Sequence, residues 1–252
     1  MTVDMPRQAQ IPQLRELWQQ AFGDSEEFLD GFFATGFDHR RSRCITWNDR
    51  VVAALYWFDC QWEGRKLAYI YAVATDENFR GKGFCRNLMT DTHHHLQKLG
   101  YFGAVLVPGN EALFELYGKL GYKTFSPKLI QEVLASGEPQ RVQAITAEEY
   151  AQKRKAYLPA GAVLQEGATL DYLATFCWFF EGENCLFCGG GNEEQLLLQE
   201  FLGDREQLPG ILSDLEVKSA RVPVPGFGTD SAMYYPLTFQ EDLPVYFGLA
   251  LN

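Results

Sequence analysis

The segment that most constrains this chain is Asn78-Phe79-Arg80-Gly81-Lys82-Gly83-Phe84-Cys85, because it joins an apolar strand to an amphipathic helix. The strand covers residues 67 to 75, and its apolar and aromatic side chains are typical of a central strand with both faces covered. Gly81 and Gly83 allow the backbone to turn tightly and to approach a ligand closely. The helix that follows directs unpaired N–H groups and the positive end of its dipole to the same place. This order of elements predicts an anion site.

Two well-known nucleotide loops share this order of strand, loop and helix, and both are rejected. The dinucleotide fingerprint GxGxxG is absent, and no segment has the form GxxxxGK[ST], whose lysine and hydroxyl hold nucleotide and magnesium. The predicted helix after the loop ends at Gly100, a residue suited to the left-handed C′ position. We expect its apolar side to hold Phe84, Leu88, Met89, His95, Leu96 and Leu99.

A second motif lies in the run Asn110-Glu111-Ala112-Leu113-Phe114-Glu115-Leu116-Tyr117-Gly118-Lys119-Leu120-Gly121-Tyr122, after a strand predicted over residues 102 to 107. The side-chain oxygen of Asn110 can cap this helix, and Gly121 can end it. A further strand is predicted from Tyr122 onward.

Both motifs resemble those of one family. Arg80-Gly81-Lys82-Gly83 resembles the acyl-CoA pyrophosphate loop (Q/R-x-x-G-x-G/A) of the GNAT superfamily of N-acetyltransferases, and the run from Asn110 to Tyr122 resembles its N-x-x-A-x-x-L-Y-x-K-x-G-F/Y segment. Two motifs in the family's order are more specific than either alone. Cys85 departs from the pattern, which has Gly or Ala there; a cysteine is still small enough for the usual backbone path, with looser contact to the pyrophosphate.

The resemblance implies an α/β (α+β) fold whose mixed sheet splays beside its central strand, where acetyl-CoA inserts. It implies direct transfer of an acetyl group from acetyl-CoA to a primary amine of a small molecule or peptide. The main chain at Val73, Ala74 and Thr75 would contact the pantetheine arm, and Asn110 would contact the cofactor near its thiol end. The pyrophosphate would lie against Arg80, Gly81, Lys82, Gly83, Phe84, Cys85 and Arg86.

The resemblance also implies that Tyr117 protonates the leaving thiolate, because a phenol with a pKa near 10 can deliver that proton without being ionised beforehand. The base that deprotonates the amine is left open. Val105 occupies the position where some relatives carry an acid. The candidates are Tyr69, Tyr71, Asp59 and Glu132.

The rest of the first half agrees with this fold. Apolar residues at helical spacing predict a helix from about Ile11 to Phe22, and Asp24 or Ser25 can cap a second one. Three antiparallel strands are then predicted at 44 to 47, 51 to 59 and 67 to 75.

Gly137-Glu138-Pro139 is the predicted linker, which gives a GNAT domain over residues 1–137 and a second domain over residues 141–252. The second domain is predicted to contain a helix from Thr146 to about Tyr157, another over residues 170 to 180, and then strand, strand, helix and strand. Gly189-Gly190-Gly191 is predicted as a turn. This order resembles a shortened second GNAT-like half.

The second half lacks a glycine loop. Where the phosphate loop would stand, Phe201-Leu202-Gly203-Asp204-Arg205-Glu206 has one glycine and two acids, so we expect no CoA site there. Residues 141 to 252 carry 7 Lys and Arg against 16 Asp and Glu, within a net charge of −11 for the chain. This acidity attracts a cationic amine or simply keeps the protein soluble.

Composition excludes several classes of function. Without a basic face, nucleic acid is not an expected partner. Neither a membrane span nor a signal peptide is evident, so we expect a cytoplasmic protein, with a homodimer left open. His93, His94 and His95 diverge by about 100° on a helix and cannot converge on one metal; we expect two of them to meet solvent. The lone pair Cys185 and Cys188 is predicted to lie on a strand, and no metal site is expected.

Two alternatives to an amine acetyltransferase remain. One is a transferase of another acyl group, because the loop recognises the CoA phosphates and not the acyl chain. The other is a non-enzymatic CoA-binding or interaction protein, against which the intact Asn110 and Tyr117 argue.

Overall fold

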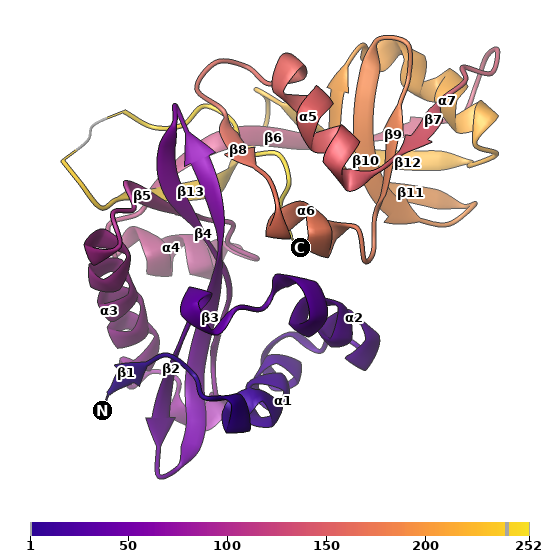
Figure 1. The fold of residues 1–252 in the computed structure, drawn as a ribbon. Coiled ribbons are helices and arrows are strands. Elements are labelled where there is room, and N and C mark those ends of the chain that lie inside the picture. The colour runs from indigo at the N-terminus through magenta and orange to yellow at the C-terminus, as the bar shows by residue number, and fades with distance from the viewer. Residues whose placement is uncertain (1, 240–241, 252) are drawn as a thin grey trace. The chain divides into compact units, whose positions relative to one another are not determined.

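A computed structural model describes residues 2–239 and 242–251 of the chain (Figure 1). It divides into two compact units, and each unit takes two stretches of the sequence. The first unit consists of Met1–Lys123 and Met233–Asp242, and the second of Thr124–Ala232 and Leu243–Asn252. A segment from near the C-terminus therefore completes the N-terminal unit.

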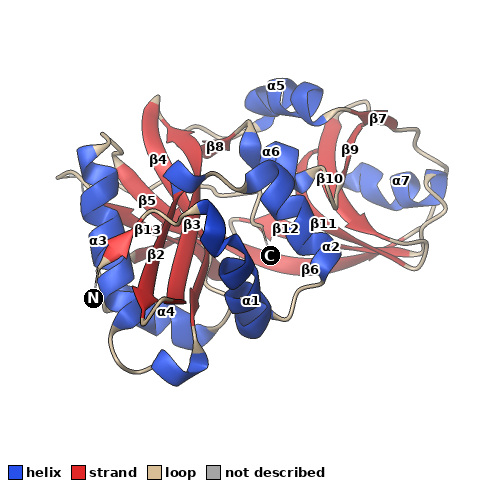
Figure 2. Cartoon of the chain, turned by 60° about the horizontal axis from the view of Figure 1, so that its bottom comes forward, coloured by secondary structure: helices blue, strands red, loops and turns tan. Residues whose placement is uncertain are grey.

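The first unit is a sheet in the order β1-β2-β3-β4-β5-β13. Its strands are β1 (Val3–Asp4), β2 (Ser42–Trp47), β3 (Arg50–Trp62), β4 (Arg65–Thr75), β5 (Gly103–Leu106) and the end of β13 (Thr229–Pro236). Its helices are α1 (Ile11–Phe22), α2 (Glu26–Gly31), α3 (Phe84–Lys98) and α4 (Glu111–Gly118), with the short helices η1 (Gln8–Gln10), η2 (Phe32–Gly36), η3 (His39–Arg41) and η4 (Glu77–Phe79). Helices α1 and α3 lie on opposite faces of this sheet (Figures 1 and 2).

Local signals set the boundaries of these helices. Gly23 follows α1 in the left-handed region, with φ of 75°, and the Ser25 hydroxyl accepts a hydrogen bond of 3.2 Å from the Phe28 amide at the start of α2. On the other face, α3 buries Phe84, Leu88, Met89, Thr92, His93 and Leu96. The prediction for this helix was wrong at two positions: Leu99 is exposed, and His93 takes the buried place assigned to His95, which is half-buried.

The second unit is a mixed sheet in the order β6-β12-β11-β10-β9-β7. Its strands are β6 (Lys123–Leu134), β7 (Gln143–Ile145), β9 (Trp178–Glu181), β10 (Cys185–Gly191), β11 (Gln195–Gly203) and β12 (Ser219–Pro225), and β8 (Val163–Gln165) lies outside this order. Its helices are α5 (Ala147–Tyr157), α6 (Ala168–Leu173), η5 (Arg205–Gln207) and α7 (Leu208–Asp214). Leu208, Ile211 and Leu212 of α7 pack on the core of β10, β11 and β12.

Both units contain the same crossover. In the first, an antiparallel meander ends in β4, and α3 leads to the parallel strand β5. In the second, β9, β10 and β11 form the meander, and α7 leads to the parallel strand β12. The two crossovers differ in size, because α3 has 15 residues and α7 has 7.

The structure differs from the sequence-based outline of the second half at two points. The predicted helix over residues 170 to 180 ends at Leu173, and β9 follows, because aromatic residues of β9 face the sheet core, where Phe180 stacks on Phe187 at 5.1 Å. Gly189-Gly190-Gly191 belongs to β10, where close contacts leave no room for side chains. The compact units part after Lys123, and β6, which follows, pairs with β12.

Candidate functional site

Strand β4 diverges from its parallel neighbour β5. The two strands pair only from Leu67 to Tyr69 of β4, and β4 then continues to Thr75, whereas β5 ends at Leu106. On its other side β4 bulges against β3. Ala72 has a φ of 47°, and the pairing register with β3 shifts between Tyr71 and Ala74. In the described part of the chain, the backbone of β4 beyond Tyr69 therefore has no strand partner on the β5 side.

The turn after β4 is anchored by a buried carboxylate. Asp76 is 1 % exposed, and its Oδ1 accepts a hydrogen bond of 2.9 Å from the Asn78 amide, which caps η4. Its Oδ2 lies 3.2 Å from a guanidinium nitrogen of Arg50 on β3, and its own amide donates to the Val52 carbonyl. This residue fixes where the strand ends and the loop begins.

The loop itself leaves open space beside its backbone. Gly81 has a φ of 73° and Gly83 a φ of 81°, values that L side chains rarely adopt, and a Cβ atom at either position would meet no atom within 4 Å. Gly83 is the N-cap of α3 and offers no capping side chain. The amides of Phe84, Cys85 and Arg86 therefore have no protein acceptor among the described residues.

Three basic side chains surround this open loop. Arg80 Nε donates to the Thr75 carbonyl at 3.1 Å, and Lys82 Nζ donates to the Asn78 carbonyl at 2.8 Å. Both side chains and that of Arg86 are exposed. A helix N-terminus, free amides and three cations are the chemical groups that favour a multiply charged anion.

Asn110 has the capping role expected from the sequence. Its Oδ1 accepts a hydrogen bond of 3.1 Å from the Leu113 amide at the first turn of α4. The side-chain nitrogen of Asn110 has no protein partner among the described residues and remains available to a ligand.

Tyr117 projects from α4 into the apolar core and is 5 % exposed. Burial raises the pKa of its phenol well above the usual range and also raises the pKa of the nearby Cys85 thiol to about 11. No described residue forms a hydrogen bond with the Tyr117 hydroxyl. Tyr117 is therefore a neutral phenol at pH 7 whose proton is not committed to a protein acceptor.

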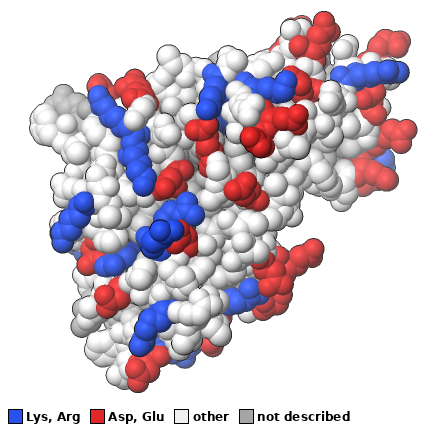
Figure 3. All heavy atoms as spheres, in the orientation of Figure 1, with Lys and Arg blue, Asp and Glu red and all other residues white. Residues whose placement is uncertain are grey.

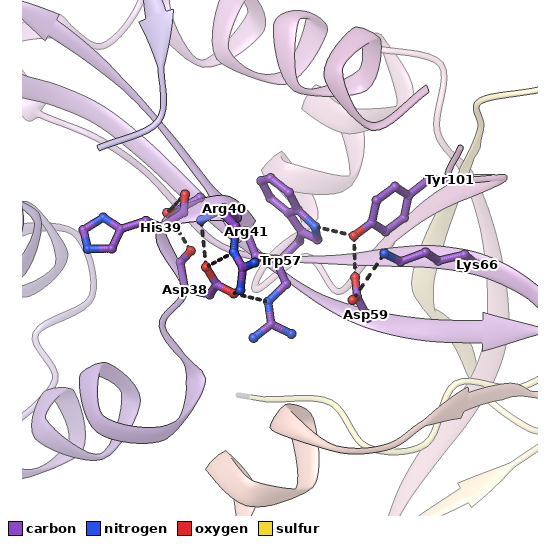
Figure 4. Close-up of polar contacts among 9 residues, drawn as sticks. Asp38, His39, Arg40, Arg41, Trp57, Asp59, Lys66 and Tyr101 are labelled. Atoms are coloured by element: carbon purple, nitrogen blue, oxygen red, sulfur yellow. Dashed lines mark hydrogen bonds and ion pairs between the residues drawn. The ribbon is translucent and has the colours of Figure 1, made fainter. Parts of the chain in front are cut away.

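Of the candidate bases, Asp59 is already engaged. Its carboxylate accepts a hydrogen bond from the Tyr101 hydroxyl and lies 3.4 Å from Lys66 Nζ, while Trp57 Nε1 donates to the Tyr101 oxygen at 3.0 Å (Figure 4). This network joins β3 to the starts of β4 and β5, at the opposite end of β4 from Thr75. The carboxylate of Asp59 therefore stabilises the sheet there.

The remaining candidates lie in different surroundings. Tyr69 is buried and Tyr71 is half-buried, and both rings pack against Phe58 on the α1 face of the sheet. Val105 is fully buried on β5. Glu132 belongs to the second unit, where it accepts a hydrogen bond of 3.2 Å from Gln195. Tyr71 is the candidate nearest along β4 to the bulge at Ala72.

Two features near the site were not singled out from the sequence. Asp76 carries a recognisable signal, an acid directly after a strand and two residues before an Asn, which is a common capping arrangement. The contact between His93 Nε2 and the Tyr122 hydroxyl, at 2.8 Å, joins residues 29 apart in sequence. Only the tertiary fold brings those two together.

Among the described residues, no group of three or more His, Cys, Asp or Glu is arranged to hold a metal ion. No described helix is both long and apolar enough to cross a membrane. On the face shown in Figure 3, Lys and Arg side chains are interspersed with Asp and Glu.

Comparison with solved structures shows the fold. The chain resembles a GCN5-related N-acetyltransferase from Kribbella flavida (TM-score 0.70, 16 % identity, 92 % of this chain and 70 % of the other). It also resembles a GCN5-related N-acetyltransferase from Anabaena variabilis, with a TM-score of 0.71 and 16 % identity over 94 % of this chain and 73 % of the other. A third similar structure is a tandem GNAT protein from the clavulanic acid biosynthesis pathway, with a TM-score of 0.57 and 10 % identity over 94 % of this chain and 98 % of the other.

Sequence similarity to a known family covers a shorter part of the chain than the structural similarity does. No curated protein matches this chain. Residues 2–125 match the family model described as the acetyltransferase (GNAT) domain, a segment that includes the open glycine loop, Asn110 and Tyr117. Residues 2–125 of the chain therefore belong to the GNAT acetyltransferase family.

Proposed function

We propose that this chain transfers an acetyl group from acetyl-CoA to a primary amine of a small molecule or a peptide. The observation that supports this most is the open loop at residues 81 to 86, where the free amides of α3 and the basic side chains fit a pyrophosphate. Membership of the family supports acyl transfer from CoA in general. The amine acceptor and its class are part of the proposal.

In this proposal each element of the site binds one part of the cofactor. Residues 80 to 86 hold the pyrophosphate, and the unpaired edge of β4 at Val73, Ala74 and Thr75 offers main-chain groups to the pantetheine arm. The Thr75 carbonyl already accepts from Arg80, so Val73 and Ala74 carry more of that contact. Asn110 contributes its free side-chain nitrogen near the thiol end.

When bound, acetyl-CoA supplies an acetyl group activated as a thioester. Tyr117 holds the proton that the departing thiolate needs, and its raised pKa keeps that proton in place at neutral pH. The ring of Tyr117 lies in apolar surroundings, because it belongs to the core cluster that includes Phe84 and Leu106. The half-buried Tyr71, beside the bulge, is our candidate for orienting the amine.

We further propose that residues 1–137 are a GNAT domain and that residues 141–252, apart from the segment Met233–Asp242 that belongs to the first unit, are a GNAT-like half without a CoA site. The shared crossover supports this, as does the likeness to a tandem GNAT protein. At the start of α7, Pro209 has no amide proton, and a Cβ atom at Gly210 would lie 2.6 Å from the Glu138 carbonyl oxygen. The first turn of α7 therefore lacks one amide donor and packs closely against the linker backbone, unlike the open loop before α3.

The proposed function is tested by measuring CoA release from acetyl-CoA with the purified protein and a panel of small amines, polyamines, aminoglycosides and N-terminal peptides. We expect release that depends on the acceptor, with the acetylated amine detected by mass spectrometry. Parallel reactions with propionyl-CoA and succinyl-CoA distinguish an acetyltransferase from a transferase of another acyl group. Binding of acetyl-CoA without release for any acceptor would indicate a binding protein. We also propose that the protein acts in the cytoplasm.

A further inference from the structure

A pocket of about 180 Å³ opens beside α3 in the first unit, away from the glycine loop at the start of this helix. One wall is a single helical face with Thr90, His93, His94 and Gln97, and the other is largely apolar, formed by Leu120, Tyr235, Pro236 and Leu237. Its volume is below the 300 Å³ or so at which sites for drug-sized ligands begin, so it suits a smaller molecule.

His93 is the group that gives this pocket its chemistry. It is 6 % exposed, and its ring stacks on the Tyr235 ring at 4.1 Å with an interplanar angle of 11°. Its Nε2 lies 2.8 Å from the buried Tyr122 hydroxyl. Burial lowers the His93 pKa to about 4, so the ring is neutral at neutral pH.

The hydrogen-bond partner of Tyr122 decides which nitrogen of His93 carries the proton. His93 Nε2 is the only acceptor that the described residues offer to the Tyr122 O–H group. A buried hydroxyl donates wherever an acceptor is in reach, so Nε2 accepts and Nδ1 carries the proton. No described residue accepts from Nδ1. The ring therefore has a free donor in the wall of the pocket.

The other polar groups in the wall complement this donor. Gln97 Nε2 donates to the Leu237 carbonyl at 2.9 Å, which orients the amide and leaves its Oε1 as a free acceptor. The Thr90 hydroxyl, which both donates and accepts, also has no partner among the described residues. A ligand that places an acceptor and a donor side by side would use both His93 and Gln97.

The charges of the lining residues limit the kinds of ligand that the pocket can bind. No Lys, Arg, Asp or Glu is among the described residues that line the pocket. A neutral planar group that presents an acceptor and a donor can pair with both His93 and Gln97, whereas an anion leaves the Gln97 acceptor unpaired and a cation leaves the His93 donor unpaired. We propose that this pocket is a binding site for a small neutral molecule with a carboxamide or lactam group. The site is separate from the glycine loop proposed for the cofactor pyrophosphate.

Three planar molecules of equal size but different charge test this proposal: benzamide, benzoate and benzamidine. Calorimetry or saturation-transfer NMR on the full chain at pH 8 should show benzamide binding in the millimolar range, and both ions about 10-fold weaker or more. Saturating acetyl-CoA should not displace benzamide. Equal binding of all three, no binding of benzamide, or displacement by acetyl-CoA would overturn the proposal.

Variants on α3 localise the binding. Thr90→Trp fills the pocket from an exposed position and should abolish benzamide binding, whereas Lys98→Trp adds the same bulk on the exposed surface outside it and should leave binding within about 2-fold. Gln97→Glu keeps the shape but adds a negative charge, so it should make benzamidine the best ligand of the three. Unchanged benzamide binding by Thr90→Trp, or an unchanged order of ligands with Gln97→Glu, would place the ligand elsewhere.

Discussion

Asp76 and Arg50 form an ion pair of 3.2 Å at the point where β4 passes into the glycine loop. The pair is unequal, because Asp76 is buried while the Arg50 side chain is 55 % exposed. The carboxylate also accepts from the Asn78 amide, so one side chain connects β3, the end of β4 and η4. The loop that we assign to the pyrophosphate is thus held in shape before any ligand binds.

We therefore expect Asp76→Ala to weaken acetyl-CoA binding by about 10-fold, because the loop would need to be ordered on binding. Loss of a hydrogen bond to a charged group should also lower the free energy of unfolding by about 1.5–3 kcal/mol. Calorimetry and urea unfolding measure the two effects. Asp91→Ala, which breaks the ion pair of 2.5 Å with Arg43 along α3, is the control and should leave CoA affinity unchanged.

Comparing substitutions at two glycines with nearly equal backbone angles distinguishes an effect on cofactor binding from an effect of backbone strain. Gly83 has a φ of 81° and Gly100 a φ of 79°, and neither has a neighbour within 4 Å of its Cβ direction. Gly83→Val and Gly100→Val should cost similar stability, about 1–2 kcal/mol for the left-handed conformation. Only Gly83→Val should weaken acetyl-CoA binding sharply in calorimetry. Equal CoA affinities for the two variants would remove residues 81 to 86 from the cofactor site.

We expect the hydroxyl of Tyr117, and not its ring, to be needed for turnover. Tyr117→Phe should lower turnover by about 10²-fold and leave CoA affinity nearly intact, the scale expected for a lost general acid. Because burial raises the Tyr117 pKa above the usual value near 10, its acid form should persist through pH 10, and turnover should show no alkaline loss from this group below that pH. Single-turnover rates across pH 7 to 10 measure both. Equal single-turnover rates in the two proteins would refute the assignment.

Local signals made much of the first unit predictable. The strand, glycine loop and helix at residues 67 to 98, and the capped helix after Asn110, depend on neighbours in sequence, such as the bond from the Leu113 amide to Asn110. The family model and the structural neighbours confirm the GNAT resemblance that those two motifs carry. The residue roles within the site remain predictions.

What was missed depends on contacts between distant residues. His93 is buried because Tyr122 and Tyr235 lie against it, and Tyr235 comes from β13, more than a hundred residues away. The helix predicted to extend to Phe180 ends early because Phe179 and Phe180 each pack on one face of a sheet. Neither the periodicity of α3 nor the aromatic composition of this segment contains that information.

Burial of His93 should make stability depend on pH. Its pKa of about 4 in the folded chain lies below the ordinary value of 6.5, so between these values the unfolded chain binds more protons than the folded one. The stabilisation is present above pH 6.5 and is lost as pH falls toward 4, by about 3 kcal/mol. Urea unfolding from pH 4 to pH 8 should show this slope, reduced in His93→Gln. His94→Gln, at the exposed neighbour, should keep it. A slope that His93→Gln does not change would assign the effect to other groups.

The end of β13, from Met233 to Pro236, belongs to the first unit and should be needed for its stability. Met233 to Pro236 pair with Leu106 to Gly103, so a chain that ends at Gly137 would leave β5 with an unpaired edge and would uncover Met233's neighbours in the core. We expect such a chain to aggregate. A second chain, in which residues 1–137 are followed by a flexible linker and residues 232–239, restores the strand and should be more soluble, as measured by sedimentation and by 1-anilinonaphthalene-8-sulfonate fluorescence. If the shorter chain were monomeric and unfolded as cooperatively as the linked one, β13 would be dispensable for the first unit.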